Sequence, residues 1–226
     1  MNFVKSLLLI AILNVGFTAS AQDLVKYVNT LQGTWSTAQL SYGATYPTVA
    51  LPYGEHFFSA QTGKNGDGRK YQYQLDKIRG FQQVHQCSPW MGDYATYSLM
   101  PVEGKLVVTE DARATTFKHT NELAGPDYYA VKFDNGISGE ITPAERGAYM
   151  RFKFTGNGDA YLVFDGGNGK ADITILPNER KLIGWVNNGF WFPGKFKAFF
   201  VIEFNQPFVS YGTCADKGKT IKANQT

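Results

Sequence analysis

The amino-acid sequence predicts an all-β protein built as a large antiparallel β-sandwich. Aromatic residues make up 15% of the 226-residue chain, and aromatic side chains favour strands. Short β-rich runs follow one another between turn signals, and no long stretch has the 3.6-residue period of an amphipathic helix. The chain also contains 24 glycines, which suit tight connections between strands. Repeated short strands with few helices are typical of a sandwich.

The clearest strand candidates extend over most of the chain. They are Lys70–Leu75, Tyr94–Met100, Leu106–Thr109, Tyr128–Phe133, Tyr149–Phe154, Tyr161–Phe164 and Phe196–Phe204. From Met150 to Phe154 apolar and basic residues alternate, which indicates a strand with one buried face.

Three glycine-containing segments predict connections. Asp134–Gly136 and Gly156–Asp159 mark tight links between strands. Gly166–Gly169 predicts a loop and not a phosphate-binding turn, because no helix follows it.

The first 21 residues have the pattern of a secretory signal peptide. Lys5 precedes an apolar run from Leu7 to Val15, and Ala19–Ala21 supplies the small residues of a cleavage site. The run is too short to span a bilayer, which takes about 20 residues, and no second run of spanning length follows, so we expect no membrane segment. The predicted organisation is a signal peptide at 1–21 and a β-sandwich domain at 22–226, exported to the periplasm or the extracellular space.

Charge and cysteine content limit the remaining choices. The net charge is only +3, and the basic residues are scattered, so a nucleic-acid partner is not supported. An oxidising compartment would permit a disulfide between Cys87 and Cys214. The sequence leaves that pairing open, because it does not show whether the two α-carbons come within bonding range.

One segment concentrates chemically active side chains. It reads Arg79-Gly80-Phe81-Gln82-Gln83-Val84-His85-Gln86-Cys87-Ser88-Pro89-Trp90-Met91-Gly92-Asp93-Tyr94. Because Pro89 prevents a continuous helix, we expect a strand that ends near His85, a rigid loop, and a new strand from near Tyr94. The loop is either a binding surface held by two strands or a simple turn in which Trp90 caps the core.

The same segment resembles the signature of glycoside hydrolase family 92, the calcium-dependent α-mannosidases common in Bacteroidetes. Cys87 is the one clear departure, since proline is usual there. Further blocks match in the expected order, at Tyr27–Thr34, Tyr46–Pro47, Leu51–Gly54, Phe117–His119, Asp127–Tyr129, Asp134–Ile137 and Thr142–Arg146. The resemblance therefore extends from about Leu24 to Tyr211.

The resemblance implies a particular domain arrangement. In this family an N-terminal antiparallel sandwich precedes a helical barrel that carries the catalytic acid and base. No helical repeat precedes Thr226, so we expect the barrel to be absent from this chain. The resemblance therefore predicts no catalytic residue here, and whether the chain is an enzyme stays open.

The resemblance also implies site residues and partners. His85, Ser88, Trp90 and Asp93 match the family motif that faces the barrel and forms part of the sugar pocket. Trp90 would stack on a sugar ring, and Asp93 would accept hydrogen bonds from sugar hydroxyls. Calcium is the implied cofactor, held mostly by the absent domain, and Asn29 is a weak candidate ligand for which a turn role is equally plausible.

Three functional hypotheses follow. The chain is the N-terminal domain of a secreted α-mannosidase that acts on α-mannoside glycans and partners the catalytic helical domain. Alternatively, it is a stand-alone carbohydrate-binding module or a β-sandwich with no ligand. Glu145 is expected to fix a strand end and not to act as a catalytic acid, and linkage specificity is not predictable from the sandwich.

Overall fold

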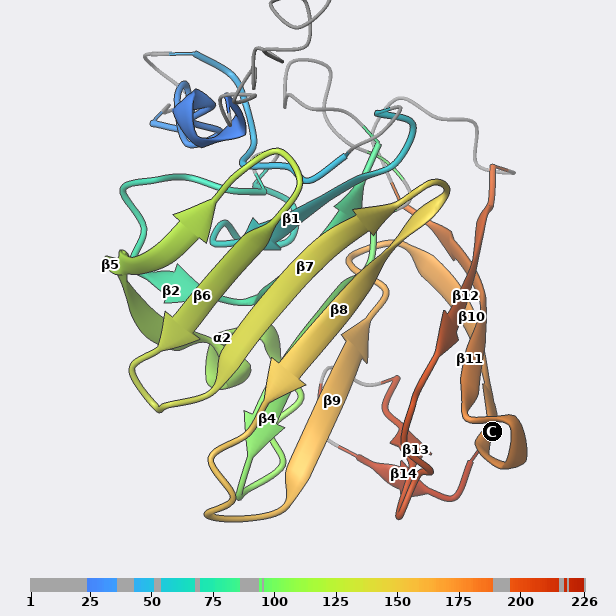
Figure 1. The fold of residues 1–226 in the computed structure, drawn as a ribbon. Helices are drawn as coiled ribbons and strands as arrows, with labels where there is room; N and C mark the ends of the chain where they lie inside the picture. Colours follow the sequence, from blue (N-terminus) through green and yellow to red (C-terminus); the bar gives the residue numbers. More distant parts are fainter. Residues whose placement is uncertain are drawn as a thin grey trace, which may run out of the picture.

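Antiparallel sheets make up nearly all of the regular structure (Figure 1). The structure is a computed structural model, and it describes residues 24–35, 43–50, 54–67, 70–85, 94, 96–188, 196–215, 218 and 220–225. Helix within these residues is confined to the short η1 (Val25–Tyr27), α2 (Glu110–Arg113) and η2 (Pro177–Glu179). The predicted all-β class is confirmed.

Two sheets form the sandwich. The first has the strand order β1-β3-β4-β9, and the second has the order β2-β5-β6-β7-β8. The strands of the first sheet are β1 (Phe57–Gln61), β3 (Gly80–Val84), β4 (Ser98–Glu103) and β9 (Ala160–Asp165). Those of the second are β2 (Lys77–Ile78), β5 (Thr115–Ala124), β6 (Tyr129–Phe133), β7 (Ser138–Ala144) and β8 (Gly147–Lys153).

The main core lies between these two sheets. Phe81 of β3 is fully buried and reaches the second sheet, where its ring lies 6.2 Å from that of Phe133 and 5.3 Å from that of Phe152. Gly139 of β7 leaves room for Phe81, because an added Cβ would overlap its ring. This close approach is a reason for a glycine inside a strand.

A third sheet packs beside the first (Figure 1). It consists of β10 (Lys170–Leu176), β11 (Lys181–Asn187) and β12 (Ala198–Glu203), and a two-stranded sheet of β13 (Gly212–Thr213) and β14 (Lys222–Ala223) lies near the end of the chain. A second core joins the third sheet to the first, with the ring of Tyr97 5.3 Å from that of Phe164 and 5.2 Å from that of Phe200. Burial raises the pKa of the Tyr97 phenol to about 12.

Two of the predicted strands are wrong. Lys70–Leu75 forms turns instead, because its backbone bonds to side chains and loops: the Gln72 N–H donates to Thr62 Oγ1 and the Tyr73 N–H to the Thr34 carbonyl. Leu106–Thr109 is also irregular, and the Val108 carbonyl accepts from the Arg113 side chain. In both segments local alternation is overridden by competing hydrogen bonds.

The other predictions fit closely. Strands occupy most of Tyr128–Phe133, Tyr149–Phe154, Tyr161–Phe164 and Phe196–Phe204, and the region from Tyr94 becomes a strand only at Ser98. Turns occur at 134–136 and 156–158, and the loop at 166–169 leads into strand β10.

Candidate functional site

The structure describes only part of the predicted sugar-binding motif. Strand β3 ends at Val84, and the partly buried His85 follows it directly, so the predicted strand end near His85 is correct. Ser88, Trp90 and Asp93 lie outside the described residues, as does Cys87, and the pairing of Cys87 with Cys214 therefore stays open.

The two ends of this motif are held together by aromatic rings. The ring of His85 stacks on that of Tyr94, with centroids 4.5 Å apart and planes inclined by 23°. Tyr94 in turn meets the edge of Phe196, at a centroid distance of 5.6 Å. Sequence positions 85, 94 and 196 therefore meet at one place, and the segment between His85 and Tyr94 begins and ends at adjacent points.

Asn188 fastens the same region through its side-chain amide. Its Oδ1 accepts from the Thr96 N–H at 2.8 Å. Its Nδ2 donates to the Thr96 carbonyl at 2.7 Å and to the Gly166 carbonyl at 2.9 Å. The amide thus connects the end of β11 to the approach to β4 and to the end of β9, which fixes the chain two residues after Tyr94.

The glycine-rich loop at 166–169 is shaped by this contact. Gly167 has φ +75°, and a Cβ there would come within 2.9 Å of Asn188 Nδ2. A Cβ on Gly169 would overlap the Asn187 carbonyl oxygen. The glycines therefore supply close backbone approach and a left-handed turn, in agreement with the predicted loop.

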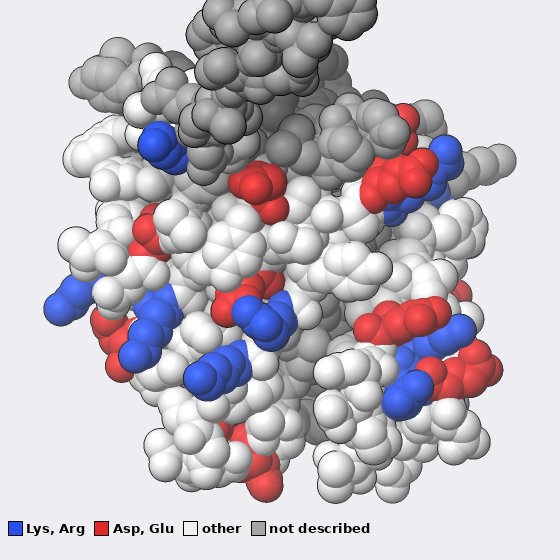
Figure 2. Space-filling view, viewed as in Figure 1, with Lys and Arg blue, Asp and Glu red and all other residues white. Residues whose placement is uncertain are grey.

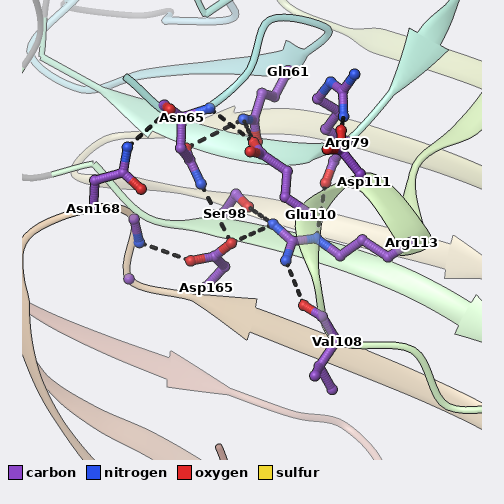
Figure 3. A network of polar contacts seen from close by, with 12 residues as sticks. Gln61, Asn65, Arg79, Ser98, Val108, Glu110, Asp111, Arg113, Asp165 and Asn168 are labelled. Atoms are coloured by element: carbon purple, nitrogen blue, oxygen red, sulfur yellow. Dashed lines mark hydrogen bonds and ion pairs between the residues drawn. The ribbon is translucent and has the colours of Figure 1, made fainter. Parts of the chain in front are cut away.

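A polar network lies beneath this loop (Figure 3). Asp165 at the end of β9 accepts from the Gly167 N–H at 2.8 Å and from Arg113 Nη2 at 2.5 Å. The Arg113 side chain is 1% exposed, and its Nη1 also donates to the Val108 carbonyl at 2.8 Å. Since Asp165 links Arg113 to the turn that contacts Asn188, the network is continuous with the base of the motif.

A second carboxylate anchors the other side of the network (Figure 3). Glu110 Oε1 accepts from Gln61 Nε2 at 2.7 Å and from the Asn65 N–H at 2.9 Å. Asp111 lies on the exposed side, where it pairs with Lys64 and, at 2.7 Å, with Arg79. Hydrogen bonds from Lys64, the larger cause, and from Arg79 lower the pKa of Asp111. Glu110, which is partly buried, is therefore held within the network, whereas Asp111 lies at its exposed edge.

A buried acid, Glu122, occupies a separate position in strand β5 of the second sheet. A register shift in β5 brings it inward, as bulges commonly do, and its side chain is 0% exposed. It accepts from the hydroxyls of Tyr71 at 2.8 Å and Tyr129 at 2.5 Å. Burial, and then the charge of Glu122, raises the pKa of both phenols well above the ordinary range.

His119 completes the Glu122 cluster. Its Nδ1 lies 2.6 Å from Glu122 Oε2, and its Nε2 donates to the Tyr73 carbonyl at 2.6 Å. Its ring also stacks on that of Tyr73 at 3.8 Å. His119 lies in strand β5 with its side chain 27% exposed, and these partners give it a structural role beside Glu122.

The described residues do not by themselves form a calcium site. Asn29 lines a shallow hollow of about 500 Å³ with Gln32 and Thr45. Its Oδ1 accepts from the Leu31 N–H at 3.0 Å, which is the geometry of a local turn. Within the described residues no three His, Cys, Asp or Glu side chains gather into a group that could hold a metal ion.

Glu145 lies at the exposed turn between β7 and β8, 4.0 Å from Arg146. Both side chains are largely exposed, so the role of Glu145 in fixing a strand end stays a prediction. On the face shown in Figure 2 the basic and acidic side chains are interspersed. Among the described residues no helix is long and apolar enough to cross a membrane.

Sequence reasoning missed the residues that hold the motif in place. No local sequence pattern predicts the roles of Asn188, Phe196 and Arg113. The available signals were the paired asparagines at the end of β11 and the glycines at 166–169.

Comparisons with known proteins agree on one family. Residues 27–226 match the model of the glycosyl hydrolase family 92 N-terminal domain. An inverting mannosidase of that family from Bacteroides thetaiotaomicron VPI-5482 has 42% identity and a TM-score of 0.83, over 89% of this chain and 27% of that one. An α-mannosidase of the family from Bacteroides thetaiotaomicron, solved with mannoimidazole, has 20% identity and a TM-score of 0.69, over 88% of this chain and 27% of that one.

A curated relative extends the comparison to another organism. It is described as an uncharacterized secreted glycosidase of Arthroderma benhamiae, and it is 25% identical over 208 residues, which are 81% of this chain and 26% of that protein. The chain therefore spans about a quarter of the length of these relatives.

Proposed function

Since this chain belongs to glycoside hydrolase family 92, whose N-terminal domain it matches over residues 27–226, we propose that it acts as the sandwich domain of an exported α-mannosidase. In this proposal residues 1–21 form the signal peptide, 22–226 form the domain, and the domain supplies part of the mannose pocket and of the interface with the catalytic region. Export is supported by the secreted relative.

The observation that carries the proposal is the fixed base of the motif between His85 and Tyr94. Stacking of these two rings and the Asn188 amide hold both ends of the segment in one geometry. A sugar pocket needs its contacting groups positioned before the ligand arrives. The third sheet and the polar network supply that support from the side of the sandwich.

Each motif residue has a proposed role that rests on the family resemblance. Trp90 stacks on the apolar face of a mannose ring. Asp93 accepts from sugar hydroxyls through its carboxylate, and Ser88 adds a hydroxyl that both donates and accepts. His85, whose ring is held by Tyr94, contributes a ring nitrogen.

Calcium belongs to the proposal only through the family. The described residues do not fit a complete site, so the catalytic region would supply most ligands. Asn29 would contribute at most one oxygen, at the expense of its present hydrogen bond to the Leu31 N–H. No step of the proposed role of this chain passes through the metal.

The test is titration of the purified mature chain with methyl α-mannoside, followed by NMR. Trp90→Ala should weaken binding by about 1–3 kcal/mol, the scale of one aromatic contact with its hydrogen bond, and should leave the melting temperature within a few degrees. Phe199→Ala is the matched control, because Phe199 is an exposed aromatic residue on the third sheet. The proposal fails if Trp90→Ala instead destabilises the fold by about 3–5 kcal/mol, as expected for a core residue, and leaves binding unchanged.

A further inference from the structure

The second sheet has an outer face on the side away from the main core. Ile141 of β7 and Phe152 of β8 pack into that core, and side chains alternate along a strand, so the residues next to them point outward. In Figure 1 this side of β6, β7 and β8 is turned toward the viewer, and none of the described elements crosses it. The surface, called the β6–β8 face below, includes Tyr128, Ala130, Ser138, Glu140, Tyr149 and Arg151.

Tyr149 gives this face an aromatic ring that is open to solvent. It is 74% exposed and lies opposite Thr142 of β7. Arg151 follows two residues later on the same side, about 7 Å along the strand. An exposed ring on a sheet is a surface on which the apolar face of a sugar ring can stack.

Arg151 is held in one orientation by Glu140. Its Nε donates to Glu140 Oε2 at 2.7 Å, and its Nη2 donates to the same oxygen. The Tyr128 hydroxyl also hydrogen-bonds with Glu140. The Glu140 side chain is 24% exposed and that of Arg151 is 76% exposed. The carboxylate therefore fixes the plane of a guanidinium that stays open to a ligand, and a guanidinium presents its N–H donors in a rigid fork.

A shallow hollow of about 420 Å³ lies beside this pair. Register places Ala130 between Glu140 on β7 and Leu123 on β5, and the short alanine side chain leaves space between its larger neighbours. Polar side chains also line the hollow, namely Thr120, Asn121, Lys132 and Ser138. Since Glu140 both lines the hollow and holds Arg151, the hollow, the ion pair and the Tyr149 ring form one continuous surface.

The chemistry of this surface favours a sugar over a protein or a nucleic acid. A protein partner would need a contiguous apolar centre, but Glu140 and Arg151 occupy the centre here. A nucleic acid would need unpaired basic groups, whereas the carboxylate of Glu140 neutralises Arg151 and disfavours a phosphate. A sugar offers an apolar ring face together with hydroxyls that donate and accept, and these match an open ring beside an ion pair, hydroxyls and an amide.

We propose that the β6–β8 face is a second glycan-binding surface, which takes sugar residues within an α-mannoside chain. The choice of α-mannoside rests on the proposed function. The surface is separate from the proposed mannose pocket, because the motif between His85 and Tyr94 follows β3 of the first sheet, and the main core lies between that sheet and this face. A shallow, open surface suits several sugars of a chain, and it would keep a glycan near the domain while a chain end occupies the pocket.

The test is titration of the isotope-labelled mature chain with α-linked mannotetraose, followed by NMR. The sugar should shift the amide signals of β7 and β8. Tyr149→Ala should weaken this binding roughly fivefold to tenfold, the scale of one aromatic contact, and should melt within a few degrees of the unaltered chain because Tyr149 is exposed. Phe199→Ala is the matched control, since Phe199 is 75% exposed on the third sheet, and it should bind as the unaltered chain does.

Arg151→Lys separates sugar recognition from simple charge. Lysine keeps the charge but not the rigid fork of donors, so the variant should also bind mannotetraose more weakly. The proposal is overturned if mannotetraose leaves the signals of β7 and β8 unshifted, or if Tyr149→Ala binds it as tightly as the unaltered chain. It is also overturned if cellotetraose or a heparin oligosaccharide binds this face in place of mannotetraose, since the ligand is then not an α-mannoside.

The same titrations distinguish this surface from the pocket. Tyr149→Ala should still bind methyl α-mannoside in the pocket, and Trp90→Ala should still show the mannotetraose shifts on β7 and β8. Shifts on β7 and β8 in a chain that does not bind methyl α-mannoside contradict the proposed pocket and leave the second surface standing. Methyl α-mannoside binding without those shifts does the reverse.

Discussion

Replacing Arg113 by methionine removes the central donor of the polar network while it keeps an unbranched side chain of similar length. The Arg113 guanidinium donates to Asp165 at 2.5 Å, to the Val108 carbonyl at 2.8 Å and to the Arg79 carbonyl at 3.2 Å. Its side chain is 1% exposed and that of Asp165 is 23% exposed. The variant therefore leaves a mostly buried carboxylate and two carbonyls without this partner.

The structure sets the size of the expected loss. Removing one partner of a buried ion pair costs about 3–5 kcal/mol. Asp165 keeps hydrogen bonds from the Gly167 N–H and Asn65 Nδ2, and its side chain is partly exposed to water. The cost of leaving this carboxylate unpaired therefore lies at the lower end of that range. With the two carbonyls included, we expect the free energy of unfolding to fall by about 3–4 kcal/mol.

Urea denaturation of the mature chain measures this value. The midpoint should fall with little change in the slope of the transition. Arg113→Met/Asp165→Leu is the informative companion, because removing both charges should recover much of the loss. A loss below about 1 kcal/mol for Arg113→Met, or a double variant as unstable as the sum of the two single variants, would refute the reasoning.

Four further predictions concern separate features. Glu122→Gln should lower the free energy of unfolding by about 2–4 kcal/mol in urea, because two buried phenols and an imidazole lose their carboxylate; a neutral result contradicts the inward bulge. Hydrogen bonds, of which that from the Thr155 hydroxyl contributes most, lower the pKa of Glu103 below its ordinary 4.5. The Glu103 carboxylate therefore stabilises the fold fully above its ordinary pKa, and this stabilisation is lost as pH falls through the lowered pKa. Melting curves of Glu103→Gln and the unaltered chain should converge in acid. Asn188→Asp sets a carboxylate against two carbonyl oxygens and should cost about 2–3 kcal/mol by urea denaturation, together with weaker mannoside binding; full retention of both would remove Asn188 from the site. Intact-mass measurement of exported protein should show a chain that starts at Gln22, and retention of Met1 would contradict the signal peptide.

The parts of the fold that sequence predicted are those with local causes. The alternation from Met150 to Phe154 belongs to the half-buried edge strand β8, and Asp134–Gly136 forms the β6–β7 turn because it supplies a left-handed glycine at φ +93°. In Lys70–Leu75 the same alternation misled, since the Gln72 N–H donates to the Thr62 hydroxyl and not to a neighbouring strand, and Tyr71 donates to Glu122.

The residues of the candidate site also divide into those that the local sequence predicts and those that it does not. The end of β3 at Val84 was predictable, because proline and glycine in the following segment stop a strand. Asn188 was not, because its partner Thr96 is 92 positions away and an asparagine after a strand looks like any turn residue. Phe196 was assigned only to a strand, yet its contact with Tyr94 joins two distant segments.

The glycine-rich loop at 166–169 shows what connects stability to the site. Its composition invites a ligand-binding interpretation, but its glycines allow Asn188 to approach and leave the Gly167 N–H directed at Asp165. Asp165 is in turn held by Arg113. A substitution that disturbs Arg113 should therefore weaken sugar binding as well as the fold, because the same hydrogen bonds end at the residues that bracket the motif. A variant that destabilises the main core without touching this network, such as Phe133→Leu, should lower the melting temperature and leave mannoside affinity unchanged.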